Sequence, residues 1–222
     1  MEYIALLLSV LIGSLLVVFL KPNNKFVSVL LTFSGAYLLS ITVLKFLPDI
    51  YKSNISHIGI FIIIGLVIQL ILDFFSKGAE HGHFHHEGST HFPYSLFVSL
   101  NIHAFMEGLP LADHQHNDLL WAIVIHHLPI AMVLASFMLY SKWNKKISIL
   151  FILLFGLMTP FGAFLGGVIP FFITYHMEIN AVVAGVLLHI STIILFESSQ
   201  NHKFNVIKFT SVLVGIFLAL II

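Results

Sequence analysis

The sequence predicts an all-α, polytopic membrane protein with eight transmembrane helices, and its composition is the first reason. Of the 222 residues, 59% are apolar and only 9% are Asp, Glu, Lys or Arg, whereas soluble domains carry about 25% charged residues. The 10 basic residues balance the 10 acidic ones, so the chain lacks the positive charge that binds nucleic acid. Cysteine is absent, which excludes disulfides and thiolate metal sites.

Eight apolar segments, separated by polar breaks, are the second reason. A helix needs about 20 apolar residues to cross a hydrocarbon core roughly 30 Å thick. The segments cover residues 3–20, 26–47, 55–75, 94–112, 119–140, 147–169, 179–196 and 204–222. We expect them to form a single transmembrane domain over residues 1–222, without a separate soluble domain.

Polar residues set the ends of these segments. The first ends at Lys21 and lacks the basic start of a signal peptide, so we expect it to remain as a helix. Asp49 lies in the polar break that follows the second segment. Charged or polar clusters at 142–146 and 198–202 follow the fifth and the seventh. The sixth contains Pro160, which membrane helices tolerate. It also contains small residues that predict close helix contacts, namely Gly156, Gly162, Gly166 and Gly167.

The lysines predict the orientation. Eight lysines fall in one set of alternate loops, which are cytosolic by the positive-inside rule: Lys21, Lys25, Lys77, Lys142, Lys145, Lys146, Lys203 and Lys208. Lys45 and Lys52 lie on the other side. Both termini are therefore expected outside. All ten basic residues are lysine, which favours an AT-rich bacterial genome and hence location in the bacterial plasma (inner) membrane.

The loop 76–93, between the third and fourth helices, is cytosolic in this topology and rich in histidine. Its histidines are His81, His83, His85, His86 and His91. Such a segment binds zinc or nickel weakly. A metal-buffering role and a plain solvated linker both remain open for it.

Four histidines and one glutamate lie well inside predicted helices, where ionisable groups are costly and mark functional sites. His103 and Glu107, four residues apart, share one helix face. His126 and His127 lie in the fifth helix and His189 in the seventh. At 1.5 Å per residue, these groups lie roughly 8 to 15 Å below the outer end of their helices. They are thus predicted at one depth.

Imidazole and carboxylate groups together suit a divalent first-row metal ion. Pro129 cannot donate a hydrogen bond to the Ile125 carbonyl, which is thereby freed as a further ligand. The sequence therefore predicts a metal site on His103, Glu107 and His126. Hydrogen-bonded packing residues are the alternative interpretation of these histidines.

Several motifs, in order, resemble those of the ZIP (Zrt-, Irt-like protein) metal-ion transporters. Residues 103–108 (HAFMEG) resemble the fourth-helix motif His-Asn-x-Pro-Glu-Gly, and 126–129 (HHLP) resemble the fifth-helix motif His-x-x-Pro-Glu. Further stretches are similar to the second, sixth and seventh helices of the family: 33–38 with 46–49, 159–163 and 184–188. The resemblance implies a ZIP-like bundle of eight helices, a metal held between the fourth and fifth helices, and one bundle sliding against the other.

The chain also departs from the family pattern. The asparagine and proline of the fourth-helix motif are Ala104 and Met106, and the glutamate of the fifth-helix motif is Ile130. A sixth-helix glutamate of some bacterial members falls on Thr159, and a second-helix histidine on Lys45. A site for one metal is therefore expected rather than one for two.

Two histidines are expected to compensate for the lost carboxylates. They are His127, next to His126, and His189, which falls where the family often has tyrosine. The predicted metal-ligand set is thus His103, Glu107, His126, His127 and His189.

We accordingly expect a transporter, not an enzyme, that moves a divalent metal cation into the cytosol. Zinc is the first expectation, with iron, manganese, cobalt, nickel or cadmium as alternatives, and no organic cofactor. The expected partners are the metal ion and the lipid bilayer, without nucleic acid, and a homodimer is left open. The alternatives are a zinc-dependent membrane hydrolase with Glu107 as base, haem-based electron transfer, and a degenerate relative that binds metal without transporting it.

Overall fold

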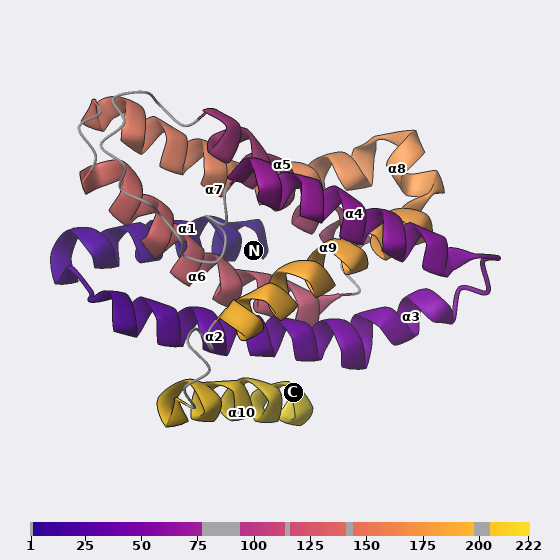
Figure 1. The fold of residues 1–222 in the computed structure, drawn as a ribbon. Helices are drawn as coiled ribbons and strands as arrows, with labels where there is room; N and C mark the ends of the chain where they lie inside the picture. Colours follow the sequence, from indigo (N-terminus) through magenta and orange to yellow (C-terminus); the bar gives the residue numbers. More distant parts are fainter. Residues whose placement is uncertain (1, 77–93, 114–115, 141–143, 198–204) are drawn as a thin grey trace.

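The computed structural model describes residues 2–76, 94–113, 116–140, 144–197 and 205–222, and in these ranges every regular element is a helix (Figure 1). The α-helices are α1 (Glu2–Leu20), α2 (Asn24–Ile41), α3 (Leu47–Tyr51), α4 (Ile58–Ser76), α5 (Tyr94–Gly108), α6 (Asn117–Tyr140), α7 (Lys145–Val168), α8 (Pro170–Thr174), α9 (His176–Glu197) and α10 (Val206–Ile221). A π-helix, η1 (Thr42–Phe46), and a 3₁₀-helix, η3 (Leu109–Asp113), complete them. The all-α prediction is confirmed for these residues.

Each of the eight predicted segments contains one long helix. Six helical stretches in the described ranges are long and apolar enough to cross a membrane, namely Tyr3–Leu20, Asn24–Tyr51, Ile58–Ser76, Asn117–Leu139, Lys145–Val168 and His176–Phe196. The helices α5, with 15 residues, and α10, with 16, are shorter. Six candidate spans are therefore established by length and composition, and eight crossings stay a prediction.

The second and fourth segments are less regular than predicted. Helix α2 continues through the π-helix η1 into α3, which together form one stretch of 28 residues. The π-turn places one extra residue in the helix. The side chains within and beyond it, Lys45 included, therefore point in other directions than in a regular helix. Helix α5 tightens into η3 directly after Gly108.

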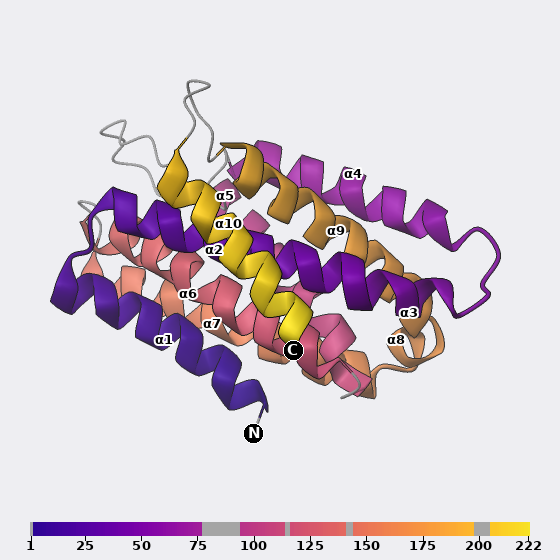
Figure 2. The ribbon, with the colours of Figure 1, turned by 90° about the horizontal axis from the view of Figure 1, so that it is seen from below.

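The long helices form two groups of four (Figure 2). In the α5–α6 bundle, α1 packs on α6 and α7, and α7 packs on α5 and α6. In the α4–α9 bundle, α9 packs on α4 and α2, and α10 packs on the outside of α2. The bundles meet where α2 lies against α6 and α4 against α5. This division into two bundles is the feature that positions the site.

Glycines bring the backbones of neighbouring helices into contact. A Cβ on Gly65 of α4 would strike the Val182 carbonyl of α9, and one on Gly185 would strike the Ile62 carbonyl in return. In the sixth predicted helix, Gly162 and Gly166 confirm the expectation of close contacts, because a Cβ on either would meet the backbone of Phe105 or Leu109. Gly167 does not, because its nearest neighbours are atoms of Ala112 at 3.9 Å.

An ion pair joins the two bundles at one end. Lys45 Nζ of η1 lies 2.7 Å from Asp118 Oδ2 in the first turn of α6. Beside it, the Phe46 ring meets the His116 ring edge-on with centroids 5.1 Å apart. The α5–α6 and α4–α9 bundles are thus connected by charge as well as by apolar contact.

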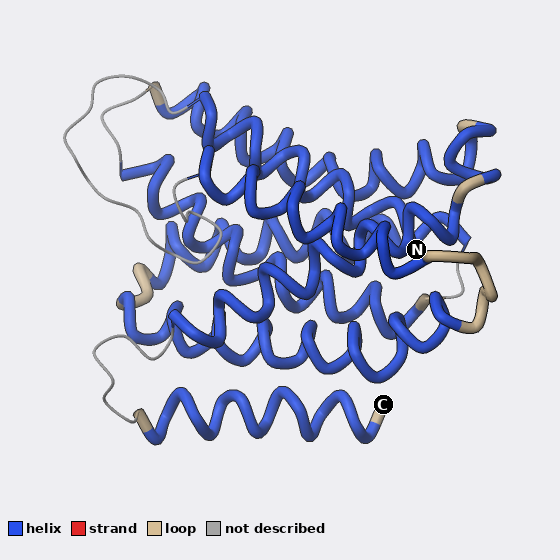
Figure 3. Tube along the Cα trace, turned by 45° about the vertical axis from the view of Figure 1, so that its right-hand side comes forward, coloured by secondary structure: helices blue, strands red, loops and turns tan. Residues whose placement is uncertain are grey.

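The start of α1 and the end of α10 lie at the same end of the bundle (Figure 3). An even number of crossings requires this arrangement, and the side of the membrane that the termini face stays a prediction. The predicted His-rich loop 76–93 begins with Ser76 at the end of α4, and residues 77–93 lie outside the described residues.

Candidate metal centre

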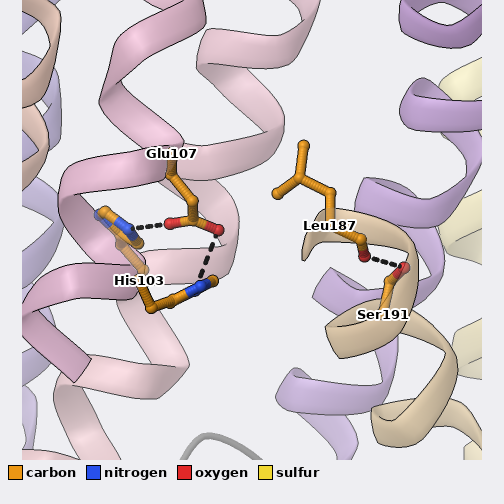
Figure 4. A network of polar contacts seen from close by, with 5 residues as sticks. His103, Glu107, Leu187 and Ser191 are labelled. Atoms are coloured by element: carbon orange, nitrogen blue, oxygen red, sulfur yellow. Dashed lines mark hydrogen bonds and ion pairs between the residues drawn. The ribbon is translucent and has the colours of Figure 1, made fainter. Parts of the chain in front are cut away.

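Helix α5 carries the first two predicted ligands on its buried face. His103 and Glu107 are both 0% exposed, as the spacing of four residues on one helix face predicts. The His103 Nε2 atom lies 3.2 Å from Glu107 Oε1 (Figure 4). A buried carboxylate without a compensating charge or hydrogen bonds is strongly unfavourable, so contacts of this kind are needed to keep Glu107 in place.

Helix α6 brings two more histidines to the same carboxylate. His126 is 0% exposed and His127 is 1% exposed. The His127 Nε2 atom lies 2.7 Å from Glu107 Oε2, and because an ionised carboxylate can only accept, the imidazole N–H donates this hydrogen bond. His127 therefore holds the second oxygen of Glu107 while His103 lies near the first.

Three of the predicted ligands form a compact group. One ligand atom from each of His103, Glu107 and His126 lies within 4.8 Å of the other two, and all three residues are buried. We call these three residues the ligand cluster. Two nitrogens and one oxygen at this spacing suit a divalent cation such as zinc. The carbonyl of Ile125 lies one turn before Pro129 inside α6. Proline has no backbone N–H, so this carbonyl lacks the hydrogen bond that it would accept in a regular helix.

His189 lies outside this group. It is half-buried on α9, in the other bundle, and the structure does not bring it within the 4.8 Å spacing of the ligand cluster. On the same helix the Ser191 hydroxyl donates to the Leu187 carbonyl at 2.6 Å (Figure 4) and is thus satisfied within α9. The predicted metal-binding role of His189 stays a prediction.

Comparison with known families identifies the chain. The family model described as ZIP zinc transporter matches residues 76–222, which is well over half of the sequence and includes the whole ligand cluster. The chain belongs to the ZIP zinc transporter family. No curated protein matches the chain. Membership of the ZIP family establishes an integral membrane protein of a metal-transporter family and supports the prediction that it is not an enzyme.

The ligand cluster of this ZIP family member lies between two apolar layers. Along α6, Leu119, Leu120 and Ile123 precede the two histidines and belong to one hydrophobic cluster, the Leu119 layer. A second cluster, the Leu134 layer, follows them on α6 from Ile130 to Met138. Leu111 of η3 belongs to the Leu119 layer, and Leu96 and Leu100 of α5 belong to the Leu134 layer. All three residues of the ligand cluster are also 0% exposed, so solvent does not reach them in this conformation.

The departures from the ZIP motif are all buried. Ala104 is 0%, Ile130 is 2% and Thr159 is 1% exposed, and Ala104 and Ile130 are part of the Leu134 layer. Apolar contacts thus occupy positions where the family motif has polar or acidic side chains. The ligand cluster contains one carboxylate, and the site for one metal stays a prediction.

Restoring a carboxylate at position 130 tests this interpretation. Ile130 lies one turn after His126, so it projects from the same face of α6. We expect Ile130→Glu to tighten zinc binding about tenfold, because a second carboxylate neutralises the cation better. The metal-free variant should be less stable, since it buries a charge in the Leu134 layer. Zinc titration and melting temperatures with and without zinc would measure both effects. Ile130→Gln is the uncharged control, and equal behaviour of the two variants would contradict the interpretation.

Some polar partners could not be found in the sequence. In the sequence, Lys45 indicates the orientation and replaces a family histidine. Neither observation predicts its ion pair with Asp118, which lies 73 positions away. Asn180 was not predicted either, although it is a polar residue with only 3% of its surface exposed. It lies beside Ile179 in an apolar helix, where periodicity gives no signal for a polar side chain.

Proposed function

We propose that this protein carries a divalent metal cation, zinc first, across the membrane into the cytosol, and that the ligand cluster is its transport site. The observation that supports the proposal most directly is the approach of three buried ligand atoms, from α5 and α6, to within 4.8 Å. A lone membrane histidine can be a packing residue, but two histidines converging on one buried glutamate are difficult to explain without a cation.

The chemistry of the cluster suits a transported ion better than a permanently bound one. Structural zinc sites are closed by four protein ligands, usually including cysteine. Here two neutral imidazoles and one carboxylate supply three ligand groups, which leaves a coordination position for water or the Ile125 carbonyl. His127, hydrogen bonded to Glu107, orients the carboxylate and can join the ligands when the ion binds. We expect His103, Glu107 and His126 to bind directly.

Transport then requires the ion to reach each side in turn. Because all three ligands are fully buried, we propose that the α5–α6 bundle, which holds them, moves relative to the α4–α9 bundle. The Lys45–Asp118 ion pair connects the two bundles at one end and separates during this movement.

The proposed topology has eight crossings, with both termini outside and the lysine-rich loops in the cytosol. The bacterial plasma (inner) membrane is the proposed location. A homodimer in the bilayer is compatible with this arrangement. The burial of all three ligands leaves no access for a peptide or ester substrate, so a hydrolase is not proposed.

Metal uptake into proteoliposomes tests the proposal. The wild-type protein should take up zinc faster than empty liposomes, and a panel of zinc, iron, manganese, cobalt, nickel and cadmium would define its preference. His103→Ala removes one of three ligands and should reduce uptake about 100-fold, because even residues that support a ligand cost 10- to 100-fold in metal affinity. His57→Ala, at an exposed position before α4, is the matched control. Equal uptake by wild type and His103→Ala would refute the transport site.

A further inference from the structure

A second feature, separate from the ligand cluster, is a partly open cavity of about 370 Å³ lined by residues of η3, α7, α8 and α9. Figure 1 shows the short helix α8 leading into the start of α9, and residues of both helices line the cavity. Its polar lining residues are Asp113, His176 and Asn180. In the proposed topology this is the outer end of the protein.

Two adjacent glycines of α7 explain why the cavity exists. Gly166 fixes η3 against α7, since a Cβ there would meet Ala112 Cβ and the Leu109 carbonyl oxygen, each at 3.0 Å. Gly167 lines the cavity, and a Cβ on it would meet nothing closer than 3.9 Å. Pro170 then begins α8 and turns the chain away from α7. The cavity is therefore a consequence of missing side chains between elements that are otherwise closely packed.

The polar groups of the lining favour a cation. Asn180 is only 3% exposed, lines the cavity, and makes no side-chain hydrogen bond among the described residues. His176 Nδ1 lies 3.1 Å from the Ile173 carbonyl oxygen and donates to it, because a carbonyl can only accept. The ring proton is therefore on Nδ1, and Nε2 carries the lone pair that can bind a metal ion. Asp113 supplies the negative charge.

No positive charge from a lysine opposes this carboxylate within the described lining. The two lysines predicted on this side of the membrane are engaged elsewhere, Lys45 with Asp118 at 2.7 Å and Lys52 with Asp49 at 2.8 Å. His116 Nε2 lies 3.8 Å from Asp113 Oδ2, so a second imidazole lies beside this carboxylate. An anion would meet the negative charge of Asp113 and no lysine. A cation would meet one carboxylate, one imidazole lone pair and one amide.

The size of the cavity indicates the form of the ion. Liquid water occupies about 30 Å³ per molecule, so the cavity has room for on the order of ten waters. Only two of its polar groups, Asp113 and His176, are strong zinc ligands, fewer than the four that close a tight site. A cation that retains most of its hydration shell fits this combination of volume and ligands.

We propose that the cavity is a loading site that binds a hydrated divalent cation weakly before the ion reaches the ligand cluster. It lies next to the cluster along the chain, since Leu109 in its wall directly follows the last residue of α5. Asp113 is six residues beyond Glu107, which corresponds to roughly 10 Å along a helix. The role in loading rests on the proposed transport function, whereas the binding of the cation does not.

Direct zinc binding tests the site independently of transport. The background is the full-length protein with Glu107→Gln and with the five loop histidines, His81, His83, His85, His86 and His91, replaced by serine. Titration calorimetry in detergent should find one weak zinc site. Asp113→Asn and His176→Ala should each weaken it at least fivefold, and Gly167→Leu should abolish it by filling the cavity. Asp49→Asn, a carboxylate on the same side, should leave it unchanged. If none of the three cavity variants binds zinc more weakly than the background protein, the proposal is wrong.

Uptake kinetics provide the second measurement, in an otherwise wild-type chain. Asp113→Asn and Gly167→Leu should raise the KM for zinc at least fivefold with little change in maximal rate, because the ligand cluster is intact. An unchanged KM in both variants, with normal wild-type uptake, would refute the loading site and leave the transport function standing. If the wild-type protein shows no zinc uptake but the cavity still binds zinc, the transport function is wrong and the cation site in the cavity stands.

Discussion

Replacing Glu107 with glutamine is expected to reduce zinc binding and uptake about 100-fold or more. Glu107 is the single carboxylate of the ligand cluster, and glutamine keeps its shape but removes its charge. Loss of a residue that merely supports a ligand costs 10- to 100-fold in metal affinity, so loss of the charged ligand itself should reach at least the upper value. Zinc titration of the detergent-solubilised protein and uptake into proteoliposomes would measure both quantities.

The controls separate the charge of Glu107 from general effects of substitution. Asp49→Asn removes a carboxylate whose partner, Lys52, is exposed, and it should leave binding and uptake unchanged. His127→Ala removes the hydrogen bond to Glu107 and should cost 10- to 100-fold, as a supporting residue does. A Glu107→Gln protein that binds zinc like the wild type would show that the metal lies elsewhere.

The largest expected effect on stability comes from Gly65→Ala at the crossing of α4 and α9. A Cβ on Gly65 would strike the Val182 carbonyl, and a backbone carbonyl cannot move aside as the end of a side chain can. The two helices must therefore separate, at a cost of about 1–3 kcal/mol for an overpacked contact. This destabilisation opposes the gain of roughly 0.5–1 kcal/mol that alanine normally brings to a helix. Thermal unfolding in detergent would measure the difference.

Gly59→Ala is the matched control on the same helix. A Cβ on Gly59 would meet only the Tyr51 hydroxyl at 3.6 Å, an ordinary contact, so this variant should be as stable as the wild type or slightly more so. If Gly65→Ala unfolded at the same temperature as Gly59→Ala, the close approach of α4 and α9 would be wrong.

Much of the fold was predictable because membrane helices are marked by long apolar runs. The sequence placed a helix in each of eight segments, and the i, i+4 spacing of His103 and Glu107 placed both on one buried face. Depth along the helix, which follows from counting residues, also predicted that His126 would lie near them. These features depend only on local helix geometry.

Other features depend on how helices rotate and pair, which residue counting does not give. Adjacent residues point about 100° apart on a helix. Their similar depth in the membrane therefore could not show that His126 joins the ligand cluster while His127 binds the Glu107 carboxylate. The same applies to His189, at a similar depth but on a helix of the other bundle. The π-turn at Thr42–Phe46 turns Lys45 in a direction that a regular helix would not, and its pairing with Asp118 is set by tertiary structure.

In the transport cycle that we propose, the single carboxylate of the ligand cluster also determines how a membrane potential acts on each half of the cycle. With neutral imidazoles, the cluster carries one negative charge when empty and one positive charge when loaded with a divalent ion. A potential of 100 mV contributes about 2.3 kcal/mol for each charge that crosses it. When the cytosol is negative, the loaded cluster is drawn inward and the empty cluster outward, so both movements are driven. A cluster with two carboxylates would be neutral when loaded, and the potential would then act only on its return.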